Sequence, residues 1–191
     1  LLDTIGAPAH GVRFGLKAIG VVPDKAAIIG CGPLGLGSLL VLKSMGVGSI
    51  YVYDVNKQRV RIAEGFGAAI LGEDDLDYAN HFAIVVEASG NENARKLALN
   101  LVKPGGFLLL LGESSNPFVI QPSPALRRKD CFYIRTFYFP LTEVPQNFEL
   151  FRRNRNAFNN LISRIGSLNE IESMHKEFCA GKTVKPLVKV N

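Results

Sequence analysis

The stretch Ile28-Ile-Gly-Cys-Gly-Pro-Leu-Gly35 decides the fold that we expect for this chain. An apolar run at residues 26–29 leads into three glycines with the spacing G-x-G-x-x-G, and residues 34–45 then place apolar side chains at helical spacing. A second apolar run at residues 50–53 ends in Asp54. The glycines therefore lie between a strand and a helix, which is the context in which this pattern indicates a dinucleotide-binding turn.

The glycines at Gly30, Gly32 and Gly35 have separate physical tasks. The first permits a tight turn, the second lets the backbone approach a diphosphate, and the third lets the helix lie against the strand. The first N–H groups of the helix have no partner within it and the helix dipole is positive there, so an anionic group is favoured at this end. A glycine-rich turn that binds nothing is the alternative at this point.

Asp54 follows the second strand, about 20 residues after the last glycine, where a carboxylate accepts hydrogen bonds from the hydroxyls of the adenosine ribose. The same negative charge would repel a 2′-phosphate. We therefore expect the cofactor to be NAD rather than NADP.

The composition excludes several other classes of protein. With 191 residues and 47% hydrophobic residues the chain can fill a core, and its net charge of +5 is spread along the chain. The basic run 127–129 has no interleaved aromatic residues, so we expect no nucleic-acid partner. The apolar runs are too short for a bilayer, so we expect no membrane partner either. Three cysteines far apart suit a reducing cytoplasm.

Strand and helix patterns alternate along most of the chain, which predicts an α/β fold with a doubly wound parallel sheet of six strands and helices on both faces. Beyond the first two strands, we expect strands at 67–71, 82–87, 107–111 and 131–138, and helices at 56–65 and 92–101. The run Lys103-Pro-Gly-Gly106 should stop the second of these helices. The acidic run 73–77 is expected to be a solvated connection rather than a metal site, because it lacks His or Asn at ligand spacing.

Three segments follow from these patterns: 1–22 as a lead-in helix, 23–140 as the NAD-binding domain, and 141–191 as C-terminal helices with an edge strand. In the first, we expect His10 to be a structural helix residue and Asp3 to be a helix N-cap. In the last, we expect helices at 145–155 and 167–179 and a strand at 184–190, whose Pro186 suits an edge position. Because the chain does not begin with Met, we expect it to be part of a longer polypeptide.

Several motifs in one order resemble the medium-chain dehydrogenase/reductase superfamily, the zinc-type alcohol and polyol dehydrogenases. They are Gly30-Cys-Gly-Pro-Leu-Gly35, Tyr53-Asp-Val-Asn-Lys57, Glu87-Ala-Ser-Gly90, Lys103-Pro-Gly-Gly106 and Gly181-Lys-Thr-Val-Lys185. The resemblance covers essentially the whole chain. It implies the Rossmann fold and a separate catalytic domain that holds zinc, whose Gly-His-Glu motif and four-cysteine lobe this sequence lacks. Asp3 and His10 have the spacing of a Glu–His pair in polyol dehydrogenases, but one carboxylate does not hold zinc.

The resemblance also implies roles for individual residues. The glycine turn would contact the diphosphate. The carboxyl ends of the second and fourth strands would contact the adenosine, and the carboxyl end of the fifth strand would contact the nicotinamide. The expected cofactor-binding residues are Gly30, Gly32, Pro33, Leu34, Gly35, Asp54, Arg59, Ala88, Ser89, Leu111, Gly112, Glu113 and Lys185. Lys185 would lie near the phosphates, although a solvated lysine on an edge strand is an equal alternative. We expect no catalytic residue and no metal ligand in this chain itself.

The sequence thus predicts the NAD(H)-binding domain of an oxidoreductase that acts on CH–OH groups, with zinc in the missing domain. The domain would position the nicotinamide for hydride transfer to or from a small alcohol or carbonyl substrate. The alternatives are a non-catalytic dinucleotide-binding module and an NADPH-linked carbonyl or quinone reductase. The resemblance also implies a homo-oligomer, a dimer or a tetramer, and leaves the substrate open.

Overall fold

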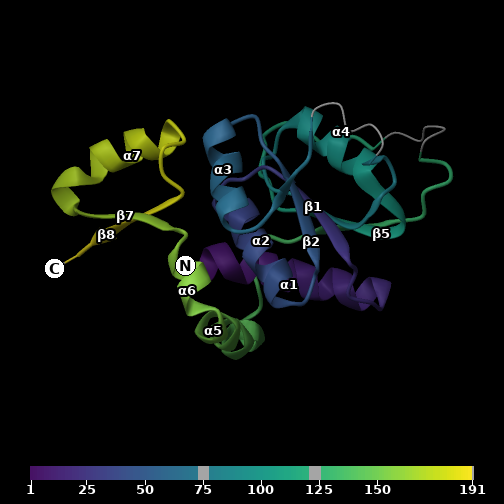
Figure 1. Ribbon diagram of the computed structural model, residues 1–191, viewed down its shortest axis with the longest axis horizontal. Coiled ribbons are helices and arrows are strands. Elements are labelled where there is room, and N and C mark those ends of the chain that lie inside the picture. The colour runs from purple at the N-terminus through teal and green to yellow at the C-terminus, as the bar shows by residue number, and fades with distance from the viewer. Residues whose placement is uncertain (73–77, 121–125, 191) are drawn as a thin grey trace.

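A twisted sheet of six parallel strands, with the order β3-β2-β1-β4-β5-β6, forms the centre of the protein. The computed structural model describes residues 1–72, 78–120 and 126–190 (Figure 1). The expected α/β fold with a doubly wound sheet is confirmed, and the strand order is that of a Rossmann fold. The strands are β1 (Lys25–Ile29), β2 (Ser49–Tyr53), β3 (Ala69–Ile70), β4 (Phe82–Glu87), β5 (Val102–Leu110) and β6 (Phe132–Arg135).

Helices cover both faces of this sheet, because successive side chains of each strand point to opposite sides. Ile28 of β1 packs in one core cluster with side chains of α1 (Leu2–Ile19), α2 (Pro33–Ser44) and α3 (Lys57–Gly65). Its neighbour Ile29 packs in a second cluster with Ala98 and Leu101 of α4 (Glu92–Leu101). Figure 1 shows α1 and α4 on opposite sides of the strands.

The order of the strands reverses between β1 and β4, which are neighbours in register from Ala26↔Ile84 to Ile29↔Glu87. In open α/β sheets, ligands bind outside the carboxyl ends of the strands at such a switch point. Gly30 follows β1 and Ala88 follows β4, so the glycine turn lies at this place. The fold therefore brings the expected binding motif to the crevice of the sheet.

Several strands have other bounds than the sequence predicts, and β3 covers only Ala69–Ile70 of the expected 67–71. β5 begins at Val102, directly after α4, so Lys103-Pro-Gly-Gly106 lies within the strand rather than in a turn before it. A register shift against β4 between Phe82 and Ile84 accommodates these residues, as a β-bulge does. β6 is shorter than the expected 131–138, since the chain leaves the sheet after Arg135.

Residues 141–190 form helices and a separate small sheet. The helices are η2 (Leu141–Glu143), α5 (Val144–Arg153), α6 (Arg155–Asn159), η3 (Leu168–Glu170) and α7 (Ile171–Cys179). The expected helix at 167–179 thus begins with a 3-10 turn. A capping box between Ser167 and Glu170 caps the amino end of this turn. β7 (Ile162–Ser167) and β8 (Lys185–Lys189) pair with each other in parallel in a two-stranded sheet, so Pro186 lies on an edge strand, as expected.

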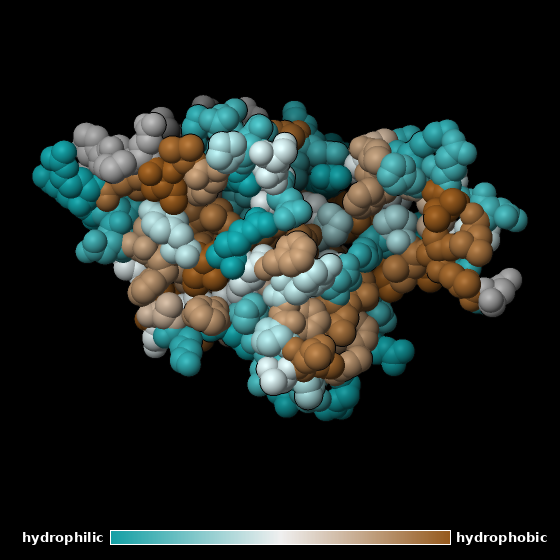
Figure 2. All heavy atoms as spheres, turned by 180° about the vertical axis from the view of Figure 1, so that it is seen from behind, coloured by the Kyte–Doolittle hydropathy of each residue, from teal (hydrophilic) through white to brown (hydrophobic). Residues whose placement is uncertain are grey.

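This small unit exposes apolar side chains. Figure 1 shows α7, β7 and β8 standing apart from the six-stranded sheet, and Figure 2, seen from behind, shows hydrophobic residues on the same unit. The large apolar residues that are exposed there are Ile165, Leu168, Ile171 and Val190.

At the other end of the chain, α1 is helical from Leu2, so the expectation that Asp3 is its N-cap is wrong: Leu1 holds that position and Asp3 lies in the first turn. His10 is a structural helix residue, as expected, because its Nδ1 lies 2.7 Å from Glu143 Oε1. Asp3 and His10 therefore have different partners and do not form a shared site. Among the described residues, no helix combines the length and the apolar character that crossing a membrane requires. The acidic run 73–77 lies outside the described residues.

Candidate functional site: a crevice at the carboxyl edge of the sheet

The glycine turn connects β1 to α2 and is as tight as its sequence indicates. Gly30 has a φ of +98°, and a Cβ there would lie 2.9 Å from the backbone nitrogen of Ser89. A Cβ on Gly35 would overlap the carbonyl oxygen of Gly30, so the helix lies directly against the turn. Gly32 differs, because the nearest atom to a Cβ there is Arg59 Nη1 at 4.0 Å. The turn therefore has no room for a side chain at Gly30 or Gly35, whereas the space beside Gly32 is open.

The amino end of α2 faces this open space. The helix begins at Pro33, and its N-cap Gly32 has no side chain that can satisfy the first N–H groups of the helix. No acidic residue lies in the first turn, whereas the Arg59 guanidinium lies beside Gly32. An uncapped helix N-terminus with an arginine beside it suits a diphosphate in charge, in hydrogen-bond donors and in space.

Asp54 is held against the turn by two backbone groups. The N–H of Cys31 donates to Asp54 Oδ2 at 2.6 Å, and the N–H of Asn56 donates to Oδ1 at 2.7 Å. Each carboxylate oxygen keeps lone pairs for a further donor, such as a ribose hydroxyl. Burial, followed by the negative charge of Asp54, raises the pKa of the Cys31 thiol to about 12, so this thiol stays neutral and packs in the core.

Two pockets flank the turn. The Asp54 pocket has a volume of about 360 Å³ and is lined by Ile29, Gly30, Tyr53, Asp54, Val55, Ser89, Asn91, Asn93, Ala94 and Leu97. The Pro33 pocket has a volume of about 250 Å³ and is lined by Asp3, Thr4, Ala7, Pro33, Leu34, Leu111, Glu113, Arg135, Thr136, Phe137, Tyr138 and Lys185. Because one pocket contains Gly30 and the other Pro33, an elongated ligand can occupy both by passing over the turn.

Two ion pairs lie at the rim of the Pro33 pocket. Lys185 Nζ donates to Asp3 Oδ2 at 2.7 Å, and Arg135 Nη2 donates to Glu113 Oε1 at 2.7 Å. Partial burial raises the pKa of Asp3, but the hydrogen bond and charge of Lys185 and the N–H of Thr4 outweigh it, so the pKa is lowered. Lys185 is thus paired with Asp3, and a ligand can bind it only by displacing this partner.

The structure brings the expected binding residues to one edge of the sheet. Ser89 lines the Asp54 pocket, while Leu111, Glu113 and Lys185 line the Pro33 pocket. Arg59 lies outside both linings and reaches instead toward Gly32 and Gly181. That these residues bind a dinucleotide stays a prediction.

Sequence reasoning missed several lining residues. Thr136, Phe137 and Tyr138 follow β6 and belong to the Pro33 pocket, but the sequence pattern assigned them to the strand itself. The rule that ligands bind beyond strand ends finds them once the strand end is known. Asn91 and Asn93 also line the Asp54 pocket, and Asn91 is the N-cap of α4.

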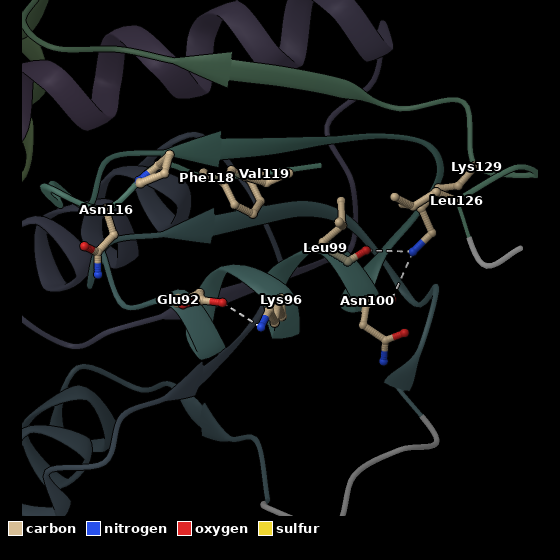
Figure 3. Close-up of a pocket in the computed structure, with 10 residues that line it drawn as sticks. Glu92, Lys96, Leu99, Asn100, Asn116, Phe118, Val119, Leu126 and Lys129 are labelled. Atoms are coloured by element: carbon tan, nitrogen blue, oxygen red, sulfur yellow. Dashed lines mark hydrogen bonds and ion pairs between the residues drawn. The ribbon is translucent and has the colours of Figure 1, made fainter. Parts of the chain in front are cut away.

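A larger cavity, of about 680 Å³, lies on another flank of α4 (Figure 3). Glu92, Lys96 and Asn100 face it, and Lys129 Nζ donates there to the carbonyl oxygens of Leu99 and Asn100 at 2.7 and 3.2 Å. Lys129 therefore caps the carboxyl end of α4, and burial lowers its pKa.

The described residues do not fit a metal ion. In residues 1–72, 78–120 and 126–190, no three His, Cys, Asp or Glu side chains come together. Zinc, which takes three or four protein ligands, therefore has no site among them.

Comparison with known proteins finds dehydrogenases and reductases among the relatives of this chain. The chain is 34% identical over 128 residues to D-altritol 5-dehydrogenase of Agrobacterium fabrum, a match that covers 65% of the chain and 38% of the relative. It is 25% identical over 203 residues to a probable D-xylulose reductase A of Neosartorya fischeri, covering 98% of the chain and 55% of the relative. No family model matches the chain.

Solved structures share the fold. Alcohol dehydrogenase TADH from Thermus sp. ATN1 superposes with a TM-score of 0.87 at 23% identity, over 99% of the chain and 56% of that protein. The expected resemblance to the zinc-type polyol and alcohol dehydrogenases of the medium-chain superfamily is confirmed. The chain spans between 38% and 55% of the length of the two relatives described above.

Proposed function

We propose that this chain binds NAD(H) across the two pockets and positions the nicotinamide of a polyol or alcohol dehydrogenase. The adenosine would occupy the Asp54 pocket, the diphosphate would rest on the amino end of α2, and the nicotinamide would enter the Pro33 pocket. The observation that carries the proposal is the open space in front of Gly32, between an uncapped helix N-terminus and the guanidinium of Arg59. The dehydrogenase and reductase names of the relatives support it.

We propose NAD rather than NADP because Asp54 cannot easily turn away. Its two oxygens are held by the N–H groups of Cys31 and Asn56, so its negative charge stays at the end of β2. A 2′-phosphate on the ribose would meet this charge at close range, whereas two ribose hydroxyls would donate to it.

The reaction we propose for the whole enzyme is hydride transfer between an alcohol or carbonyl carbon and the cofactor. Bound NAD supplies the hydride acceptor, and the residues of this chain hold its ring against the substrate. Zinc would be held by residues outside the described ones, in a separate catalytic domain. The exposed apolar face of α7, β7 and β8 supports the interpretation that 141–191 returns toward that domain.

Three further expectations belong to the same proposal. The partners are a dinucleotide and a small alcohol or carbonyl substrate, and the enzyme is a homo-oligomer, which light scattering of the purified protein tests. We propose the cytoplasm as its location, since Cys31, Cys131 and Cys179 are all free thiols.

Calorimetric titration of this chain with NADH, NADPH and ADP-ribose tests the proposal. We expect NADH and ADP-ribose to bind, NADPH to bind at least tenfold more weakly, and Gly32→Ala to bind none of them. Tighter binding of NADPH would contradict the role of Asp54 and favour the NADPH-linked reductase. No binding of any dinucleotide would contradict the proposal as a whole.

A non-catalytic dinucleotide-binding module would give the same titration. The coding sequence before Leu1 separates the two functions, because a Gly-His-Glu motif with a preceding Cys supports the enzyme. A native start codon near Leu1 would favour the module.

A further inference from the structure

A buried carboxylate lies directly behind the crevice. Glu87, the last residue of β4, is wholly buried, and its Oε1 accepts three hydrogen bonds: from the N–H of Ser89 at 2.8 Å, the Ser89 hydroxyl at 2.6 Å and the N–H of Gly90 at 2.9 Å. Glu87 therefore determines the conformation of the turn 88–90. Ser89 of this turn lines the Asp54 pocket.

The other oxygen of Glu87 faces a buried arginine. Glu87 Oε2 has no hydrogen-bond partner, and Arg95 Nε lies 3.8 Å from it. Arg95 is 7% exposed, and its other two nitrogens donate to the carbonyl oxygens of Asn116 at 3.2 Å and Gly112 at 3.4 Å. Its guanidinium also lies over the ring of Phe118. Arg95 therefore holds the segment 112–118 against α4.

The two segments held by this ion pair touch each other. A Cβ on Gly112 would overlap the nitrogen of Gly90, and a Cβ on Gly90 would overlap the carbonyl oxygen of Glu113. The backbone N–H of Gly112 also donates to the carbonyl oxygen of Glu87 at 3.0 Å. A change in one segment must therefore displace the other.

We propose that Glu87 and Arg95 act as one positioning unit that sets the distance between the two pockets, so that one dinucleotide fits both. Glu87 holds the segment at the Asp54 pocket, and Arg95 holds the segment whose Glu113 lines the Pro33 pocket. A buried charge pair is a costly way to hold two loops, since an apolar pair of similar volume is often as stable. This inference rests on the proposed binding of NAD(H), which it deepens.

The positioning unit is tested by comparing the binding of NADH with the binding of ADP-ribose, which lacks the nicotinamide. In Arg95→Met, the segment 112–118 loses the two donors of Arg95 and keeps those of Arg135, while Ser89 and Gly90 keep their acceptor. We expect the dissociation constant of NADH to rise about tenfold and that of ADP-ribose to change less than about twofold. The increase in NADH fluorescence on binding, which reports the surroundings of the nicotinamide, should be lost as well.

Arg95→Met leaves Glu87 buried without a counter-charge and so can fail to fold. The double variant Glu87→Gln/Arg95→Met removes both charges, keeps an acceptor for Ser89 and Gly90, and should show the same selective loss. Lys96→Met is the matched control, because Lys96 is the next residue of α4 and pairs with Glu92 at the surface. We expect it to bind both ligands like the unmodified chain.

Three outcomes would overturn the inference: equal weakening of NADH and ADP-ribose, no change in either, or loss of ADP-ribose alone. The first would show a merely structural role for the pair. If the unmodified chain binds neither ligand, the proposed function fails and the inference fails with it. If the unmodified chain binds both and the variants behave like it, only the inference fails.

Discussion

The backbone N–H of Cys31 donates to the carboxylate of Asp54 at 2.6 Å, which ties the glycine turn after β1 to the acid that ends β2. The two features of the sequence that indicate dinucleotide binding are therefore one structural unit. The geometry of the turn and the position of the negative charge depend on each other, so a change at Asp54 also acts on the turn.

Asp54→Asn should weaken NADH binding about tenfold and narrow the difference between NADH and NADPH, because the charge that repels a 2′-phosphate is removed. Calorimetric titration with both cofactors measures this. Asp130→Asn, at an exposed residue just before the amino end of β6, is the matched control and should leave both affinities unchanged. A wider preference for NADH in Asp54→Asn would contradict the role of the carboxylate.

Two glycines of the turn should respond differently to alanine. A methyl group on Gly35 overlaps the carbonyl oxygen of Gly30, so Gly35→Ala should lower the free energy of unfolding by about 1–3 kcal/mol. Gly32 has a φ of −73° and open space around its Cβ position, so Gly32→Ala should unfold at the same temperature as the unmodified chain.

Gly32→Ala should nevertheless lose dinucleotide binding, because the methyl group takes the space of the diphosphate. Thermal unfolding and titration with ADP-ribose separate the two effects. If Gly32→Ala binds ADP-ribose normally, the diphosphate does not lie where we propose.

Lys185 and Asp3 form a pair at the rim of the Pro33 pocket, and their variants show which of them meets the ligand. If Lys185 exchanges Asp3 for a phosphate, Lys185→Met should weaken ADP-ribose binding about three- to tenfold. Asp3→Asn should leave this binding unchanged or improve it, since Lys185 is then free. Equal weakening by both substitutions would mean that the pair only joins α1 to β8.

The contact between α1 and the segment before α5 should make stability depend on pH. Burial raises the pKa of Glu143, but hydrogen bonds from Arg13 and His10 outweigh it, so the pKa is lowered in the folded protein. A carboxyl group with a lowered folded pKa stabilises the fold above its unfolded pKa of about 4.3, and this contribution is lost as the pH falls through the folded pKa.

We therefore expect the melting temperature to fall between about pH 5 and pH 3, and to fall less steeply in Glu143→Gln, which lacks this contribution at every pH. Thermal unfolding across this range measures the difference. Glu64→Gln, at an exposed residue of α3, should follow the unmodified chain. Parallel curves for Glu143→Gln and the unmodified chain would contradict the argument.

The central α/β part could be predicted from the sequence because its signals are local. Apolar runs of four to six residues predict buried parallel strands, and only glycine suits the φ of +98° at Gly30. Asp54 was found in the same way, since it stands at the end of a strand at a characteristic distance from the turn. The chemistry of each of these positions is determined by its own residue and its near neighbours.

The sequence was less informative wherever a residue depends on a partner far along the chain. Asp3 reads as a helix cap, yet it pairs with Lys185, which is 182 residues away. The sequence predicts an edge strand at 184–190 but does not show its partner, which is β7 in a small sheet of its own.

By itself, the sequence determined the six-stranded fold, the glycine turn and the acid beside it, because backbone sterics and hydrophobic periodicity act over a few residues. Only the tertiary structure decided which charges meet: Asp3 with Lys185, His10 with Glu143, and Glu87 with Arg95. A charged side chain has no periodicity that indicates its partner. Its partner is set by the packing of helices and strands, which brings together residues that the sequence keeps apart.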